Sequence, residues 1–235
     1  MDKALRSPAS TIVPRKKAVA KVALVELNPA TCGTLSECFR QFGIETVNMD
    51  GDVADRLQRE KYEACVMNLK PGAEVIMESA RTSRSNSRMI IYGLGGSAQD
   101  AMRYSKYGIN AVFHEPLERQ AALKLVRATH TLVLHEFRRY VRIPVITEIS
   151  VVCSDNRRFT ATSQEISSGG MSMQADEEVA IGQNVEISFA LLTLPRIWVR
   201  GTVSWRKNKN FGIRFDLLDE RRSRIREWIE AYLES

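Results

Sequence analysis

Residues 138–175, RRYVRIPVITEISVVCSDNRRFTATSQEISSGGMSMQA, show where the architecture of the chain changes. Before Arg138 the apolar residues recur at helical spacing. After it they alternate with polar residues, which is typical of strands with one buried face. The alternation predicts strands at Val145–Val152, Phe159–Ile166 and Met171–Ala175.

The alternating pattern continues almost to the end of the chain. Three more strands are predicted at Val185–Leu192, Ile197–Arg206 and Phe211–Phe215. Four residues of the Ile197–Arg206 strand are expected on one face: Val199, Gly201, Val203 and Trp205. A final amphipathic helix, capped near Asp219, carries apolar residues at i, i+3, i+4 and i+7: Ile225, Trp228, Ile229 and Tyr232. Six antiparallel strands in so short a segment predict an all-β barrel, with this helix as its cover.

The N-terminal part predicts a different architecture, because short strands and helices alternate along it. The strands are expected at Lys21–Leu27, Ile44–Val47, Ala64–Met67, Met89–Tyr92 and Ala111–Phe113. The helices are expected through Leu35 to Phe42, which Gly43 ends, and then at Val53–Glu60, Val75–Arg81, Ala98–Tyr107 and Leu117–Phe137. Five such units with short loops favour an α/β doubly wound parallel five-stranded sheet.

Length and composition agree with two modest domains. The chain has 235 residues, of which 44% are hydrophobic and 26% charged, values typical of globular protein. Nearly uncharged stretches such as Val185–Pro195 fall short of the roughly 20 apolar residues of a membrane helix. Residues 1–21 lack the apolar region of a signal peptide. We therefore expect a cytoplasmic protein without membrane insertion.

The formal charge of +6 is concentrated at the N-terminus. Residues 1–21 hold six Lys or Arg and a single Asp, so the remainder of the chain is nearly neutral. A DNA-binding domain usually has its own basic face, so we expect no DNA partner and interpret residues 1–20 as a basic flexible tail. The four cysteines and three histidines lack metal-site spacing. The expected domains are then residues 21–137 and 138–235.

Two short motifs in the second domain are more specific than its strand pattern. Arg138-Arg139-Tyr140-Val141-Arg142 fits Arg-x-x-x-Arg, and residues 165–171, EISSGGM, nearly fit (Asp/Asn)-x-Ser-x-x-Gly. With residues 201–205, GTVSW, and 211–215, FGIRF, the segment 138–235 resembles a PilZ domain. In that family the two motifs bind the bacterial second messenger cyclic di-GMP, on a β-barrel with a C-terminal helix.

The resemblance implies a set of ligand-binding residues: Arg138, Arg139, Arg142, Glu165, Ser167, Gly169 and Gly170, with Trp205 as an additional candidate. Guanidinium groups can form paired hydrogen bonds with phosphates or with guanine O6 and N7, and a carboxylate can accept from guanine N1 and N2. Glu165 stands where the family has Asp or Asn. Purely structural explanations stay open, because cations are favoured at a helix C-terminus and Ser-Ser-Gly-Gly is a good turn.

The first domain resembles, more loosely, a response-regulator receiver over residues 21–137. Asn68 takes the place of the phosphorylated Asp, Glu115 that of a Lys, and Gly93 that of a Ser or Thr. Glu26 is the only acid at the end of the first strand, where receivers have a metal-binding pair. Phosphoryl transfer to a carboxylate needs the nucleophile and the cation. The resemblance therefore implies a pseudo-receiver that serves as an interaction scaffold.

These observations predict a bacterial cyclic di-GMP receptor that is not an enzyme, has no cofactor or metal, and signals to an unidentified protein partner. A homodimer stays open. One alternative is an interaction adaptor whose PilZ barrel does not bind nucleotide. Another is an oxidoreductase, because residues 93–98, GLGGSA, fit the dinucleotide-binding pattern G-x-G-x-x-A. That loop follows the fourth strand, whereas the dinucleotide motif follows the first.

Overall fold

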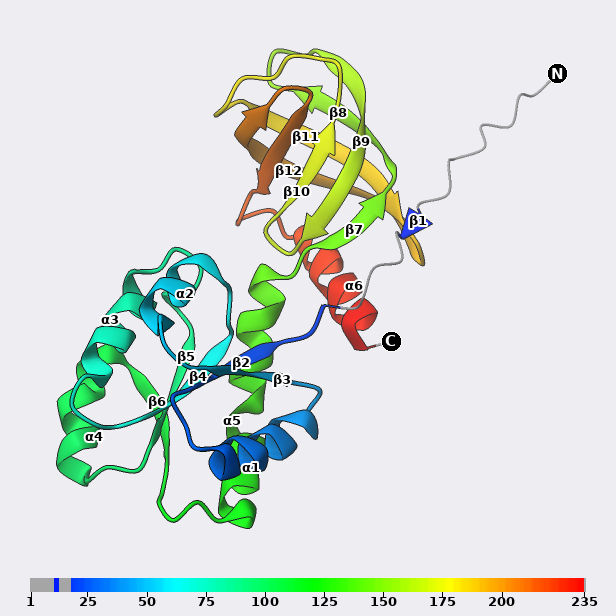
Figure 1. The fold of residues 1–235 in the computed structure, drawn as a ribbon. Helices are drawn as coiled ribbons and strands as arrows, with labels where there is room; N and C mark the ends of the chain where they lie inside the picture. Colours follow the sequence, from blue (N-terminus) through cyan, green and yellow to red (C-terminus); the bar gives the residue numbers. More distant parts are fainter. Residues whose placement is uncertain (1–10, 13–17, 235) are drawn as a thin grey trace. The chain divides into compact units, whose positions relative to one another are not determined.

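The computed structural model describes residues 11–12 and 18–234. The chain forms two compact units, one of residues 18–137 and one of residues 138–234 together with 11–12 (Figure 1). No helix among these residues is long and apolar enough to cross a membrane.

The N-terminal unit contains five parallel strands in the order β3-β2-β4-β5-β6, as predicted. Their bounds are β2 Lys21–Val25, β3 Glu45–Met49, β4 Ala64–Asn68, β5 Ile90–Leu94 and β6 Ile109–Phe113. Strand β2 ends two residues earlier than expected, because Glu26 adopts a positive φ of 49°. A positive φ takes the backbone out of the extended conformation.

Helices cover both faces of this sheet (Figure 1). Helices α1, Pro29–Arg40, and α5, Arg119–Tyr140, bury apolar side chains against one face. Helices α2, Val53–Arg59, α3, Ala73–Thr82, and α4, Ala98–Tyr104, cover the other, and the 3₁₀ turn Ser105–Tyr107 follows α4. Helix α5 extends three residues beyond the predicted Phe137, so it runs from one unit into the other.

The C-terminal unit is a closed barrel of six antiparallel strands, as predicted. Strand pairing runs β9-β10-β13-β12-β11-β8, and a β8–β9 pairing closes the ring. The bounds are β8 Glu148–Cys153, β9 Arg158–Ser167, β10 Gly170–Gln174, β11 Asn184–Leu191, β12 Leu194–Lys207 and β13 Asn210–Phe215. Buried and outward-facing side chains alternate along much of these strands, and the alternation is interrupted where β9 and β12 carry bulges.

One predicted strand is wrong, because Val145–Val152 is divided between β7, Ile143–Ile146, and β8. Pro144 lies opposite Glu165, whereas Glu148 lies opposite Thr162, so the register shifts by one residue at Thr147. The buried hydroxyl of Ser163 bridges the break: it accepts from the Thr147 N–H at 2.8 Å and donates to the Val145 carbonyl. The hydroxyl thus serves as the acceptor for the Thr147 N–H, while the Ser163 N–H still donates to the Thr147 carbonyl at 3.0 Å.

The predicted flexible tail, residues 1–20, differs from the structure at three residues. Ala20 is buried in the core of the N-terminal unit, where its carbonyl accepts from the Glu45 N–H at 2.9 Å. Thr11 and Ile12 form β1, which pairs antiparallel with β7 through Thr11 opposite Ile146 and Ile12 opposite Val145. The rest of the predicted tail up to residue 17 lies outside the described residues.

The C-terminal helix α6, Arg222–Glu234, packs on the barrel through Ile225, Trp228 and Ile229. The Trp228 indole N–H donates to the Leu192 carbonyl at 2.8 Å. The chain enters α6 through Asp219, whose side chain is only 3% exposed and whose carbonyl accepts from the Arg222 N–H.

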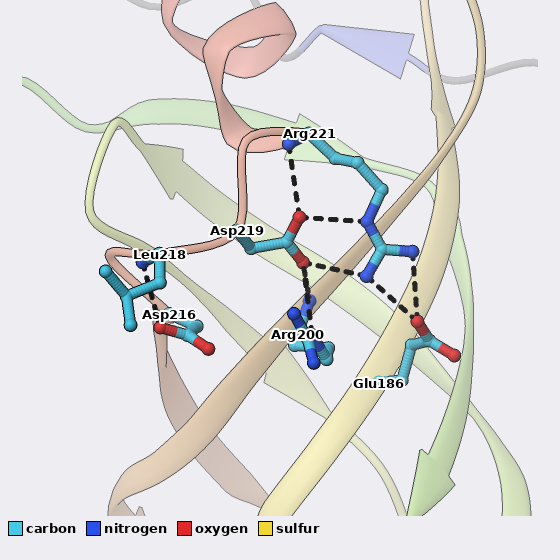
Figure 2. Close-up of polar contacts among 6 residues, drawn as sticks. All are labelled: Glu186, Arg200, Asp216, Leu218, Asp219 and Arg221. Atoms are coloured by element: carbon cyan, nitrogen blue, oxygen red, sulfur yellow. Dashed lines mark hydrogen bonds and ion pairs between the residues drawn. The ribbon is translucent and has the colours of Figure 1, made fainter.

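Asp219 is the centre of a polar network that joins the start of α6 to the barrel (Figure 2). Its carboxylate accepts from the backbone N–H of Arg200 at 2.9 Å and from that of Arg221 at 3.1 Å. The Arg221 guanidinium donates to both carboxylate oxygens, at 2.9 and 2.8 Å, and to Glu186 on β11 at 3.0 Å. These donors, led by Arg221, hold the pKa of Asp219 well below its usual value.

We predict that Asp219→Asn destabilises the barrel by about 2–3 kcal/mol, because an amide cannot accept from all these donors. A carboxyl whose pKa is lowered by folding stabilises the protein above its unfolded pKa, and this contribution is lost as the pH falls below about 4. The variant should therefore lose less stability than the parent between pH 6 and pH 3. Urea unfolding followed by tryptophan fluorescence measures this, because Trp198, Trp205 and Trp228 all lie in the barrel unit.

The matched control for this experiment is Asp176→Asn, which removes an acid whose side chain is 85% exposed from an ion pair with Lys209. It should change neither the stability nor its pH dependence noticeably. Equal behaviour of the two variants would contradict the role given to Asp219.

Candidate functional site

A groove of about 950 Å³ lies on the outside of the barrel, over β7, β9, β10, β12 and β13. It gathers seven of the eight ligand-binding residues expected from the sequence: Arg139, Arg142, Glu165, Ser167, Gly169, Gly170 and Trp205. Arg138 is half-buried and does not line the groove. The structure thus brings both motif segments to one surface.

The arginine segment is positioned by the end of α5. Arg139 is exposed in the last turn of this helix, where cations interact favourably with the helix dipole. After the helix, Arg142 lies between two buried residues, Val141 and Ile143, so its side chain is directed outward. Local burial on either side therefore fixes the direction of Arg142.

Glu165 reaches the groove because β9 carries a bulge. Ser172 of β10 lies opposite Glu165 and Met173 lies opposite Ser163, which leaves Gln164 without a partner residue. Without this extra residue Glu165 would continue the buried face of Ser163. The bulge instead turns the carboxylate outward, and the Gln164 amide donates to Asn210 Oδ1 at 2.9 Å.

Trp205 is turned outward in the same way by a bulge in β12. Val203 pairs with Ile213 and Trp205 with Gly212, so Ser204 is the extra residue. The prediction that Trp205 shares the face of Val203 is therefore wrong: Val203 is buried, whereas Trp205 is 43% exposed. The sequence pattern could not show this, because a bulge reverses the alternation beyond it.

The Trp205 indole occupies the space that a side chain at Gly212 would need. A Cβ built on Gly212 would lie 2.0 Å from Trp205 Nε1 and 2.4 Å from Cε2. The absence of a side chain at residue 212 thus lets the ring lie on strand β13. The arrangement gives the groove an aromatic surface on which a flat base could stack.

The serine-glycine motif forms the tight β9–β10 hairpin. Ser167 pairs with Gly170, the Ser167 hydroxyl donates to the Gly170 carbonyl at 3.1 Å, and the Gly169 carbonyl accepts from the Phe215 N–H at 2.9 Å. A Cβ on Gly170 would lie 2.2 Å from the Ile213 carbonyl oxygen. Close approach of β13 therefore requires glycine at residue 170, a reason different from the ligand contact expected from the sequence.

We predict that Gly170→Ala destabilises the barrel by about 1–3 kcal/mol, because a backbone carbonyl must move to admit the methyl group. Gly169→Ala is the matched control, since a Cβ on Gly169 meets no atom within 4 Å. It should change the stability by less than about 0.5 kcal/mol. Urea unfolding would contradict this assignment if the two variants were equally stable.

Arg214 also lines the groove and was not assigned a role from the sequence. It could have been found by alternation, because it lies on β13 between Ile213 and Phe215, which are both buried.

Comparison with known proteins agrees with this geometry. The family model described as PilZ domain matches residues 136–234. Residues 136–234 are a PilZ domain. A solved PilZ domain, that of CeSA from a cellulose-synthesizing bacterium, is 15% identical, with a TM-score of 0.35, over 40% of this chain and 99% of that one. Among curated proteins, none matches the chain.

The unit that precedes the PilZ domain is similar to receiver domains of known structure. The receiver domain of the sensor histidine kinase PA1611 from Pseudomonas aeruginosa PAO1 is 22% identical, with a TM-score of 0.41, over 49% of this chain and 98% of that one. The chemotaxis response regulator CheY4 of Vibrio cholerae is 15% identical, with a TM-score of 0.41, over 47% and 98% of the two chains.

The ends of the receiver-like strands carry the residues singled out from the sequence. Asn68 is the last residue of β4, and its amide donates to the Glu26 carbonyl at 3.5 Å. The Glu26 carboxylate forms an ion pair with Lys70 at 3.3 Å. Among the described residues, no three His, Cys, Asp or Glu side chains are grouped in a way that could hold a metal ion.

The glycine-rich segment at the end of β5 and just after it is closely packed by its neighbours. A Cβ on Gly93 would lie 2.7 Å from the Leu69 side chain, and one on Gly95 would lie 2.2 Å from a carboxylate oxygen of Glu115. A pyrophosphate approaching Gly95 would therefore meet a negative charge. This geometry disfavours the dinucleotide-binding alternative.

Proposed function

We propose that this chain is a non-catalytic cytoplasmic receptor for cyclic di-GMP, which binds in the groove of the PilZ domain. The observation that carries the proposal is the convergence of the two motif segments on that groove. Arg139 and Arg142 come from the end of α5 and the residues after it, Glu165 comes from β9, and Trp205 comes from β12.

The chemistry of these groups matches the ligand. The arginines can neutralise the two phosphates through charge-assisted hydrogen bonds. The Glu165 carboxylate can accept from guanine N1 and N2, and the Trp205 indole can stack on a base. Arg138 is included through the family resemblance, and its side chain would have to turn toward the groove. A volume of about 950 Å³ is within the range of small-molecule sites.

We predict that Arg142→Ala and Arg138→Ala each weaken cyclic di-GMP binding by about tenfold to a hundredfold, because each removes a charged hydrogen-bond donor. Arg139→Ala should weaken binding as well. Isothermal titration calorimetry measures the dissociation constants. Arg158→Ala is the matched control: Arg158 is an exposed arginine on β9 that lines no part of the groove.

Two outcomes would contradict this proposal. Binding that is unchanged in Arg142→Ala and Arg138→Ala would remove the arginine segment from the site. A parent protein that does not bind cyclic di-GMP at all would favour the adaptor, in which the barrel acts without nucleotide.

We propose further that the receiver-like unit passes the signal to a protein partner without phosphorylation. The continuous helix α5 supports this, because its last three residues, Arg138–Tyr140, contain two of the proposed ligand-binding arginines. Closing residues 138–142 around an anionic ligand would act directly on the end of this helix. The ligand can shift the conformation only by its better contacts with one state.

We predict that the receiver-like unit takes up no phosphoryl group, because Asn68 has no nucleophilic carboxylate. Glu115 places a further negative charge at the ends of the strands. The measurement is intact mass after treatment with acetyl phosphate and magnesium. A stable gain of one phosphate that maps to residues 21–137 would show that the unit is an active receiver.

A further inference from the structure

Arg214 stands directly beside the serine-glycine motif. It lies on β13, opposite Gly170 on β10 and Thr202 on β12. Its exposed side chain is on the outer face of the barrel, and Gly170 has no side chain to occupy the adjoining surface. The hydrogen bond from the Phe215 N–H to the Gly169 carbonyl ties this part of β13 to the hairpin. Arg214 is thus held at the groove by backbone contacts.

Among the described residues, the exposed Arg214 guanidinium has no hydrogen-bond or ion-pair partner. Two other arginines of the barrel are engaged: Arg206 pairs with Glu178 at 3.6 Å, and Arg221 pairs with Asp219 at 2.8 Å. The five N–H donors of Arg214 are therefore available to a bound molecule.

The Trp205 indole is the neighbour of Arg214 on this face. The ring covers Gly212, and Arg214 is two residues further along the same strand, which corresponds to about 7 Å. Both side chains line the groove. A purine stacked on the indole would place its edge within reach of the guanidinium.

We infer that Arg214 recognises guanine in the groove, by donating to O6 and N7 of a base that stacks on Trp205. The inference rests on the proposed binding of cyclic di-GMP. A guanidinium matches the two acceptors on this edge of guanine. Adenine presents an amino donor in place of O6, which a guanidinium cannot satisfy. Arg214 would thus distinguish guanine from adenine, whereas Arg139 and Arg142 bind phosphate.

The experiment compares Arg214→Ala and Arg214→Lys with the parent by calorimetry with cyclic di-GMP, and by competition with cyclic di-AMP. Both variants should weaken cyclic di-GMP binding by about tenfold or more, because lysine keeps the charge but not the paired donors. The preference for cyclic di-GMP over cyclic di-AMP should fall by a similar factor in Arg214→Ala. Arg158→Ala on β9 is the control and should keep both values.

The outcomes separate this inference from the proposed function. If the parent binds cyclic di-GMP and Arg214→Ala binds equally well, Arg214 is not a ligand contact, and the receptor proposal stands. If Arg214→Lys restores parental affinity and preference, the residue supplies only charge, and base recognition is overturned. If the parent binds no cyclic di-GMP, both the inference and the receptor proposal fail. Thermal unfolding of each variant shows whether it is folded.

Discussion

Side chains along a strand alternate between its two faces, and the groove depends on this constraint. One extra residue in a strand moves every side chain beyond it to the opposite face. Gln164 in β9 and Ser204 in β12 are such residues, and they turn Glu165 and Trp205 out of the barrel. The groove thus has its carboxylate and its indole because bulges in β9 and β12 interrupt the regular alternation of inward and outward side chains. The apolar core is kept, because Ile166 and Val203 on either side of the bulges remain buried.

Close approach of strands to β13 explains several glycines that the motifs contain. Gly170 and Gly201 each face a carbonyl of β13, at 2.2 and 2.6 Å from where a Cβ would be. Gly212 belongs to β13 itself, and the Trp205 indole lies where a side chain at residue 212 would be. The same residues that make the motif recognisable therefore shape the barrel, so loss of binding in a glycine variant does not identify a ligand contact. Variants of the exposed arginines identify it better.

The sequence predicts the order of elements well, because burial sets their hydrophobic pattern. The five βα units, the closed six-stranded ring and the two motif segments all follow from spacing and turn residues. The break at Thr147 does not, because Val145–Val152 is apolar on both sides of it and the buried hydroxyl of Ser163 supports the break from another strand. The outward turn of Trp205 was missed for a related reason: the extra residue, Ser204, has no distinctive sequence signal.

The pairing of β1 with β7 has a consequence for where the barrel begins. Strand β7 lies outside the closed ring, and Thr11 and Ile12 supply the neighbour on its open side. A fragment cut at Arg138 would lose that neighbour and expose backbone donors and acceptors, which favours pairing with another molecule. The PilZ unit is therefore discontinuous in the chain, because it includes residues that precede the receiver-like unit.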